Sequence, residues 1–254
     1  MQKLSFYKYQ GTGNDFVMVD NRSEDLKVSK ALVRQLCDRR FGIGADGLIL
    51  IENKEGCDFE MVYYNSDGSQ SLCGNGSRCA VRFAEFLGIV SGSTRFMTID
   101  GVLTAEINPE SIRLKMPDVN KVETAGKDYF IHTGSPHYIQ FVDKVKDFDV
   151  FENGKSLRDF KKDGTNVNFV EKTGENSIFV RTFERGVEDE TLSCGTGVTA
   201  CALACGYLGF KGPVAVQTLG GQLSVNFEKS NDSQFQNIYL EGPAEFVFEG
   251  IFRY

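Results

Sequence analysis

A cysteine followed directly by Gly-x-Gly occurs twice in this chain, and each copy precedes an alanine-rich segment that favours a helix. The copies begin at Cys73 and Cys194, and the helical segments Cys79–Leu87 and Thr199–Leu208 both end at Leu-Gly. Each cysteine is therefore expected at a helix N-terminus, where unpaired backbone N–H groups and the helix dipole favour a thiolate and any nearby anion. The glycines allow a carboxylate to approach the backbone closely. The two copies predict a pair of similar sites.

Short patterns on either side of the two cysteines also recur, in the same order and at a nearly constant spacing. The spacing drifts by only a few residues, as loop insertions would produce, so an internal duplication explains the matches better than chance. We expect two similar domains, residues 1–117 and 118–243, with residues 244–254 completing the first. The matched residues are Gly11, Asn14, Val19 and Asp20 with Gly134, His137, Val142 and Asp143; Met61, Tyr64 and Asn65 with Val180, Phe183 and Glu184; Cys73 and Gly88 with Cys194 and Gly209; Thr98, Gly101 and Leu103 with Thr218, Gly221 and Leu223; and Ile112, Leu114 and Pro117 with Ile238, Leu240 and Pro243.

In each half the hydrophobic pattern predicts a strand, a helical connector, two further strands, the helix after the cysteine, and a three-stranded meander. Many short strands with one long apolar helix indicate an α+β fold, in which a curled, mostly antiparallel sheet wraps a central helix in each domain. One more strand, Glu245–Phe252, has no counterpart after Asp118. The other predicted elements are strands at Phe16–Asp20, Leu48–Glu52, Phe59–Tyr64, Arg95–Ile99, Val102–Ile107 and Ile112–Met116, their matches at Tyr138–Asp143, Asn168–Glu171, Ser177–Phe183, Val214–Thr218, Gln222–Phe227 and Ile238–Glu241, and connectors at Ser29–Arg39 and Lys155–Phe160.

Composition excludes several classes of protein. The chain has 254 residues, a net charge of -7 and no basic cluster, which argues against a nucleic-acid partner. Its N-terminus lacks the apolar core of a signal peptide, and no apolar run is long enough to span a membrane. Seven cysteines without a compact disulfide framework suit a reducing cytoplasm, and two histidines with no C-x-x-C pair argue against zinc. We expect a cytoplasmic protein without a membrane or nucleic-acid partner.

Eight short motifs extend from the first predicted strand nearly to the last quarter of the chain. They are Gly11–Phe16, Gly42–Gly47, Tyr64–Ser69, Cys73–Cys79, Gly134–His137, Asn166–Phe169, Phe183–Gly186 and Cys194–Gly197. In this combination the chain resembles the diaminopimelate epimerases, which are cofactor-independent amino-acid epimerases of lysine and cell-wall precursor synthesis. The resemblance implies two similar domains with the active site in the cleft between them. It also implies conversion of LL-2,6-diaminopimelate to meso-diaminopimelate.

Inverting a carbon that bears an amine and a carboxylate requires removal of its proton from one face and delivery of a proton to the other. A single base would return the proton to the face it came from, so two opposed acid–base groups are needed. The resemblance implies that Cys73 and Cys194 are these groups, one as thiolate and one as thiol. Cys79, Cys201 and Cys205 recur within the helices, and we expect them in the core.

The backbone N–H groups that follow each cysteine are suited to the charge that develops on the substrate α-carboxylate. We expect them to belong to Gly74, Asn75, Gly195 and Thr196. The resemblance also implies that Asn14, Asn65 and Asn166 bind the substrate, that Arg185 pairs with its distal carboxylate and that Glu184 meets an ammonium. Taken singly, each asparagine is also typical of a turn, and Glu184-Arg185 of a solvated pair at a strand end.

Three further positions concern substrate recognition and the proton path. His137 aligns with Asn14, and we expect either a proton partner for a cysteine or a capped turn histidine. Ser135 occupies a position where many members of the family carry Asn, and Gly47 one where some carry Gln. Both differences remove a side-chain contact to the substrate.

We expect no cofactor, because the sequence contains no phosphate loop, metal cluster or lysine-centred motif. The segment Gly42–Gly47 matches G-x-G-x-x-G, but it follows a helical pattern and precedes a strand, the reverse of a dinucleotide site. By resemblance we expect a homodimer with a small-molecule substrate. Three alternatives remain: a proline or hydroxyproline racemase-like enzyme of the same fold, a dithiol redox protein, and a binding module without activity.

Overall fold

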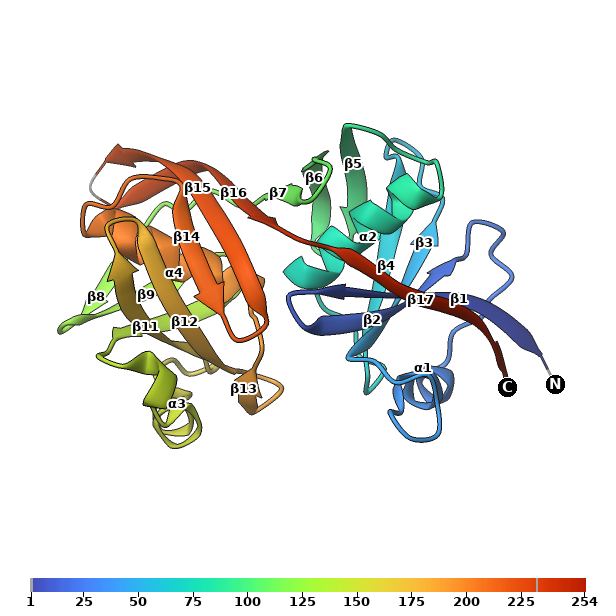
Figure 1. The fold of residues 1–254 in the computed structure, drawn as a ribbon, viewed down its shortest axis with the longest axis horizontal. Helices are drawn as coiled ribbons and strands as arrows, with labels where there is room; N and C mark the ends of the chain where they lie inside the picture. Colours follow the sequence, from blue (N-terminus) through green and yellow to red (C-terminus); the bar gives the residue numbers. More distant parts are fainter. Residues whose placement is uncertain (1, 232) are drawn as a thin grey trace. The chain divides into compact units, whose positions relative to one another are not determined.

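The computed structural model describes residues 2–231 and 233–254, which form two compact units. One unit consists of Met1–Leu114 with Gly242–Tyr254, and the other of Lys115–Glu241. Each contains a strongly curved sheet and one long helix (Figure 1). Within the described part of the chain, no helix has the length and apolar character needed to cross a membrane.

The first unit is built on a sheet in the order β17-β1-β2-β3-β4-β5-β6-β7. The pairs β2–β3 and β4–β5 are parallel and the others antiparallel. The chain ends lie together in this unit, where the Gln2 N–H donates to the Tyr254 carbonyl at 2.8 Å (Figure 1). The strands are β1 (Lys3–Gly11), β2 (Asn14–Asp20), β3 (Gly47–Glu52), β4 (Phe59–Asn65), β5 (Ser93–Thr98), β6 (Gly101–Ile107), β7 (Ile112–Lys115) and β17 (Glu245–Arg253).

Strand β3 is buried along almost its whole length because a helix packs on each of its faces. Leu48 and Leu50 join the apolar cluster around α1 (Lys30–Cys37). Ile49 points the other way, since its Cδ1 atom would lie 3.1 Å from a Cβ placed on Gly76 in α2 (Gly74–Phe86). Successive side chains of a strand face opposite sides, so a continuous apolar run fits a strand covered on both faces.

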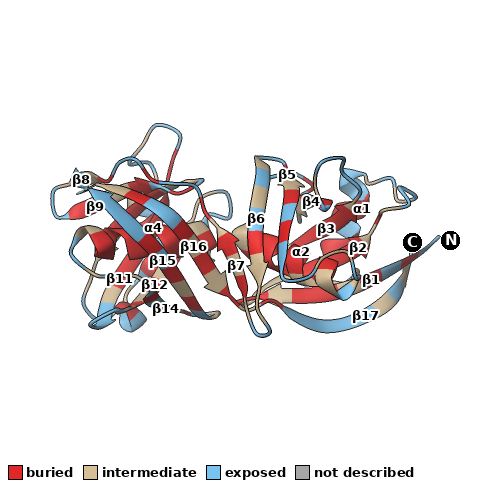
Figure 2. Ribbon diagram, turned by 90° about the horizontal axis from the view of Figure 1, so that it is seen from above, coloured by how far each residue is buried: buried red, intermediate tan, exposed pale blue. Residues whose placement is uncertain are grey.

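Helix α2 begins at Cys73 as its N-cap and is largely buried inside its unit (Figure 2). The small side chains of its first turn allow this close packing. The helix ends before Gly88, whose φ of 71° is in the left-handed region that favours glycine. The N–H groups of Gly88 and Ile89 donate to the carbonyls of Glu85 and Ala84, which closes the last turn.

The second unit repeats this sheet, with the order β8-β9-β10-β11-β12-β14-β15-β16 and the same sequence of antiparallel and parallel pairs. Its buried helix α4 (Gly195–Tyr207) also has 13 residues and a cysteine N-cap, and ends before a glycine of positive φ, Gly209 (Figure 2). The predicted α+β fold of two similar domains is confirmed. The other elements are β8 (Glu123–Ala125), β9 (Asp128–His132), β10 (Pro136–Phe141), η1 (Val145–Asp147), α3 (Val150–Leu157), β11 (Asn166–Gly174), β12 (Ser177–Glu184), β13 (Asp189–Thr191), β14 (Val214–Thr218), β15 (Gly221–Asn231) and β16 (Gln234–Gly242).

The edge strands β17 and β8 occupy corresponding places in the two sheets. β17 follows Pro243 and pairs with β1, and β8 follows Pro117 and pairs with β9. The expectation that the final strand has no counterpart was therefore wrong. β8 has only three residues, too few for a recognisable hydrophobic alternation.

Two further predictions differ from the structure. The connector α3 begins at Val150 because the Asp149 carboxylate accepts from the Glu152 N–H at 3.1 Å and caps the helix earlier than expected. Phe160, expected in that helix, instead packs its ring against Tyr138, with ring centroids 4.7 Å apart. Strands β1, β9 and β13 were not predicted, and in β1 the buried Lys8 and a bulge at Lys8/Tyr9 interrupt the alternation.

Candidate functional site

Cys73, at the start of α2, contacts one hydrogen-bond donor and one hydrogen-bond acceptor. Its sulfur accepts from the Gly76 N–H at 3.3 Å, and its thiol donates to Asn14 Oδ1 at 3.5 Å. The Asn14 amide has a defined orientation, because its Nδ2 donates to the Asp46 carboxylate at 2.6 Å. Asn75 Nδ2 also donates to Asn14 Oδ1, at 3.4 Å. The first unit thus brings Asn14, Cys73 and Asn75 together.

Arg78 places a positive charge inside the first unit, on the same helix as Cys73. Its side chain is fully buried, and its Nη2 donates to Asn75 Oδ1 at 3.0 Å and Thr12 Oγ1 at 3.3 Å. Its Nη1 has no hydrogen-bond partner in the described part of the chain. Burial lowers the pKa of Arg78, and the sulfurs of Cys79 and Cys73, when ionised, raise it. By reciprocity, the guanidinium favours the thiolate form of those cysteines.

Asn65 and Gly47 lie opposite one another in the β3–β4 pair. The Asn65 amide donates to the hydroxyls of Ser69 and Ser71, both at 3.1 Å, which are contacts of a turn residue. A Cβ at Gly47 would lie 2.4 Å from the Tyr63 ring, so the packing there explains why this position is glycine. The role of Asn65 in substrate binding stays a prediction.

Cys194 starts α4 as Cys73 starts α2. Its backbone carbonyl accepts from the Val198 N–H at 2.8 Å, and its sulfur lies 3.5 Å from Thr196 Oγ1. Thr196 Oγ1 in turn lies 3.0 Å from both Ser135 Oγ and His137 Nε2. His137 is fully buried, and burial lowers its pKa to about 3, so the ring is neutral. These four residues form one continuous hydrogen-bonded group.

Asn166 extends this group towards Arg185. Its Nδ2 donates to Ser135 Oγ at 3.3 Å, and its Oδ1 accepts from the Arg185 N–H at 2.9 Å. The Arg185 guanidinium donates to the Asp163 carbonyl at 3.0 Å. Glu184 accepts from the Thr191 hydroxyl of β13 at 2.9 Å. The predicted residues of the second unit therefore cluster at the ends of β10, β11 and β12 and the start of α4.

Asn168, Thr182 and Arg78 were not predicted as site residues from the sequence. Asn168 is fully buried, and its amide contacts His137 Nδ1 at 3.1 Å and the Thr182 hydroxyl at 3.0 Å. The position of Asn168 between the apolar residues Val167 and Phe169 could have identified it, because a buried amide requires hydrogen-bond partners. Arg78 carried a similar signal as a charge within an otherwise buried helix.

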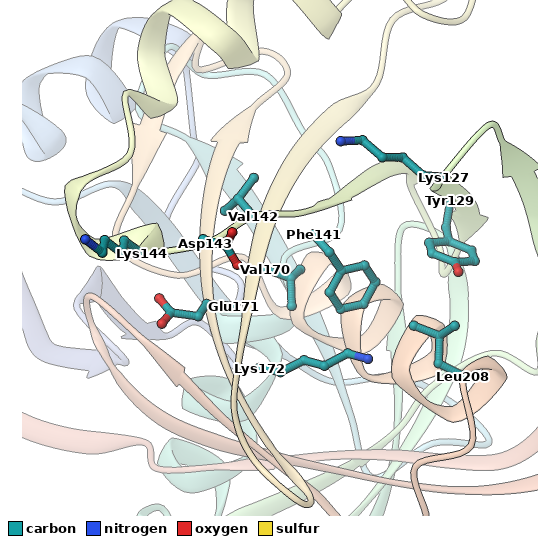
Figure 3. Close-up of a pocket in the computed structure, with 10 residues that line it drawn as sticks. All are labelled: Lys127, Tyr129, Phe141, Val142, Asp143, Lys144, Val170, Glu171, Lys172 and Leu208. Atoms are coloured by element: carbon teal, nitrogen blue, oxygen red, sulfur yellow. The ribbon is translucent and has the colours of Figure 1, made fainter.

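The other cysteines of the two helices are not part of these hydrogen-bonded groups. Cys79, Cys201 and Cys205 are buried as expected, and burial raises the pKa of each thiol, to about 12 for Cys205. No group of three or more His, Cys, Asp or Glu within the described ranges could hold a metal ion. A hollow of about 600 Å³ in the second unit (Figure 3) is lined by Lys127, Tyr129, Phe141, Val142, Asp143, Lys144, Val170, Glu171, Lys172 and Leu208.

Sequence comparison identifies relatives over nearly the whole chain. The family model described as diaminopimelate epimerase matches residues 6–122 and 129–247. A diaminopimelate epimerase of Flavobacterium psychrophilum is 51% identical over 254 residues, covering 97% of this chain and 99% of the relative. That of Aquifex aeolicus is 42% identical, covering 97% of each chain.

Solved structures share the fold at low sequence identity. A phenazine biosynthesis protein of the PhzF family from Bacillus anthracis superposes with a TM-score of 0.75 at 16% identity, covering 100% of both chains. A hydroxyproline epimerase from Agrobacterium vitis gives 0.68 at 12% identity, covering 98% of this chain and 92% of that one. The fold is therefore the duplicated α+β architecture that these proteins share. The sequence matches are more specific, and the chain belongs to the diaminopimelate epimerase family.

Proposed function

We propose that this protein is an isomerase that converts LL-2,6-diaminopimelate to meso-diaminopimelate, with Cys73 and Cys194 as its acid–base pair. Family membership over nearly the whole chain supports the substrate. The observation that carries the mechanism is that each unit begins its buried helix with a cysteine N-cap. Such positions favour ionised sulfur, and two of them match the requirement for two bases.

In the proposed reaction, one cysteine thiolate takes the α-proton and becomes a thiol. The electron pair left on the α-carbon delocalises into the α-carboxylate, where backbone N–H groups stabilise the added charge. The other cysteine thiol then gives its proton to the opposite face and becomes a thiolate. In comparable enzyme sites, loss of one N–H donor to the developing charge raises the activation free energy by about 3 kcal/mol. The N–H groups of Gly74, Asn75, Gly195 and Thr196 are suited to this task.

Each cysteine must change between thiol and thiolate during turnover. The surroundings of Cys73 suit both forms, since Asn14 Oδ1 accepts from the thiol and the Gly76 N–H donates to the sulfur. For the rest of the substrate we propose that Asn14, Asn65 and Asn166 form hydrogen bonds along it, that Arg185 pairs with the distal carboxylate and that Glu184 binds an ammonium. Arginine and carboxylate form a bidentate pair, which suits recognition of the centre that stays unchanged.

Cysteine substitution tests this function. Cys73→Ser and Cys194→Ser should each lower turnover of LL-diaminopimelate at least about 10²-fold, because a hydroxyl is too weak an acid at neutral pH to replace the thiol. Cys57→Ser is the matched control and should keep wild-type turnover, because Cys57 lies in a surface turn. Turnover near the wild-type rate in either helix-cap variant would contradict the proposal.

The same assay separates the alternatives. The reduced, metal-stripped protein should epimerise LL- and meso-diaminopimelate, and should leave proline and hydroxyproline without α-proton exchange in deuterated water. A proline racemase-like enzyme would give the opposite pattern. A dithiol redox protein would show disulfide exchange without epimerisation, and a binding module neither activity.

We also propose that the enzyme needs no cofactor and acts in the cytoplasm as a homodimer. Two thiols supply the acid and the base, and free thiols persist in a reducing compartment. The dimer is supported by the edge strand β17, where Val247, Phe248 and Ile251 are 52%, 44% and 65% exposed. An exposed apolar edge strand of this kind favours pairing with a second copy.

A further inference from the structure

We infer that Asn168 is a positioning residue, which fixes the tautomer of His137 and thereby directs the Thr196 hydroxyl to the sulfur of Cys194. The inference rests on the proposed function, because the hydrogen bond it describes serves a cysteine that acts as acid and base. It concerns only the second unit. It follows from counting which atoms in a buried network can donate and which can accept.

The orientation of the Asn168 amide is set by two neighbours. A backbone carbonyl can only accept, and Asn168 Nδ2 lies 3.0 Å from the Tyr138 carbonyl oxygen. On the other side of the amide, Oδ1 accepts from the Thr182 hydroxyl at 3.0 Å. The second N–H of Nδ2 therefore points at His137 Nδ1, 3.1 Å away. His137 Nδ1 must be an acceptor.

The ring proton of His137 consequently lies on Nε2. The neutral imidazole carries one proton, and the burial that lowers its pKa to about 3 excludes the doubly protonated ring at neutral pH. Nε2 then donates to Ser135 Oγ at 2.9 Å or Thr196 Oγ1 at 3.0 Å. Neither hydroxyl can donate back to it.

Ser135 is oriented by a second amide. Asn166 Nδ2 donates to the Pro136 carbonyl at 3.1 Å and to Ser135 Oγ at 3.3 Å. Because His137 Nε2 is protonated, the acceptor for the Ser135 hydroxyl proton within this network is Thr196 Oγ1, 3.0 Å away. The Thr196 hydroxyl then donates to Cys194 Sγ at 3.5 Å, within hydrogen-bond reach of sulfur. All the donors are accounted for, and the chain of hydrogen bonds ends at the sulfur.

Glycine at position 197 makes room for this arrangement. A Cβ there would lie 2.4 Å from Asn168 Oδ1 and 3.2 Å from His137 Cε1. The second glycine of the motif therefore lets the His–Asn pair pack against the first turn of α4. The Ser135 hydroxyl, which replaces the amide expected at this position, also acquires a defined role as the donor that directs Thr196.

A hydrogen bond donated to sulfur stabilises the thiolate relative to the thiol, so the network lowers the pKa of the Cys194 thiol. The other titratable groups nearby are Cys201 on α4, His137 and His132 on β10 and β9, and Arg185 after β12. If His137 adopted the other tautomer, Nε2 would be an acceptor 3.0 Å from Thr196 Oγ1 and would compete with the sulfur for the Thr196 hydroxyl proton. The hydrogen bond to the sulfur would then be weakened.

Nitrogen-15 NMR of histidine-labelled protein tests the tautomer directly. The chain has two histidines, and His132→Gln assigns the remaining ring. The inference predicts a protonated Nε2 and an unprotonated Nδ1 in the wild type. In Asn168→Asp, the carboxylate accepts from the ring, so the proton should move to Nδ1. An unprotonated Nε2 in the wild type would overturn the inference, whether or not the protein is an epimerase.

The pH dependence of kcat/KM in both directions of the reaction tests the consequence. Asn168→Asp should raise the pKa of Cys194 by about one unit. The acidic limb should move to higher pH by that amount in the direction where Cys194 is the base. The alkaline limb should move up in the reverse direction, where Cys194 is the acid. If the tautomer changes and both limbs stay in place, the inference is wrong.

Two variants complete the experiment. Thr199→Val is the matched control, because the Thr199 hydroxyl is also buried in α4 but donates to the Gly195 carbonyl outside the network. Neither limb of the pH profile of kcat/KM should move in this variant. Asn168→Ala avoids a buried charge and carries the test if Asn168→Asp does not fold. It should give a mixture of tautomers and a smaller shift of the same sign. A wild type that does not turn over diaminopimelate refutes the proposed function, while the NMR result stands separately.

Discussion

A histidine enclosed on all sides is costly to charge, and His137 is in this position. Its pKa is lowered to about 3, first by burial and then by the nearby charges of His132 and Arg185. The unfolded chain has no such restriction and binds a proton below about pH 6.5. Below that pH the unfolded state therefore binds more protons than the folded state. Stability must fall as the pH is lowered.

This dependence is measurable in the free energy of unfolding. Between pH 6.5 and about 3, His137 should reduce stability by up to about 1.4 kcal/mol per pH unit. Urea denaturation of the wild type and of His137→Gln at several pH values checks this. The variant should be less stable at pH 7 but should lose stability less steeply on acidification, whereas His132→Gln serves as the control for an exposed histidine. Equal slopes for the wild type and His137→Gln would contradict the account.

At the scale of elements, strands and helices with uninterrupted patterns could be predicted, and those defined by partners elsewhere could not. The two cysteine-capped helices follow from small residues before Leu-Gly, and β3 from its apolar run. β1 could not be recognised, because Lys8 is buried by its ion pair with Asp15 at 2.7 Å rather than by apolar character. β8 has only three residues, too few for a recognisable alternation. β17 was predicted as a strand, but its pairing with β1, far away in sequence, is encoded by no local pattern.

The same limit applies to the candidate site. The cysteines were found because they repeat, and His137 because it aligns with Asn14. Asn168 and Arg78 act through buried contacts that appear only once the sheet curls around the helix. Residues of this kind are identified by their hydrogen-bond partners rather than by sequence spacing.

The return of the C-terminal strand β17 to the sheet of the first unit makes a prediction about stability. Deleting Glu245–Tyr254 removes the partner of β1 and exposes Leu4, Phe6 and Tyr9. The backbone amides of the first unit should therefore be less protected against hydrogen exchange. Hydrogen exchange followed by mass spectrometry should show faster exchange in β1 and β2, with protection kept in α4. Unchanged exchange in β1 would show that β17 contributes nothing to that sheet.

At the scale of the whole molecule, the repeated pairing pattern of the two sheets gives each unit the same buried helix and the same cysteine cap. A duplicated fold is an economical source of two similar acid–base groups, because one architecture supplies both helix N-termini. The differences lie in the residues around each sulfur. Asn14 faces Cys73 with an acceptor, whereas Thr196 offers Cys194 a hydroxyl.

The proposed homodimer makes a separate prediction at this scale. Ile251→Glu places a charge on the exposed apolar edge of β17 and should convert the dimer to a monomer, as measured by light scattering after size exclusion. Ile99→Glu is the matched control, since Ile99 is also an exposed isoleucine of the first unit, 57% exposed, but lies away from β17. A wild type that is monomeric, or an Ile251→Glu variant that stays dimeric, would refute this surface.

The central claim is that two different cysteines handle the two protons of one turnover. It is tested most directly by converting LL-diaminopimelate in deuterated water and analysing the first product formed. The account predicts one solvent deuterium at the inverted carbon of every meso-diaminopimelate molecule, because the thiol that delivers it exchanges with solvent before the substrate binds. Product that retains the original hydrogen at that carbon would contradict it, since a single base would then have removed and returned the same proton.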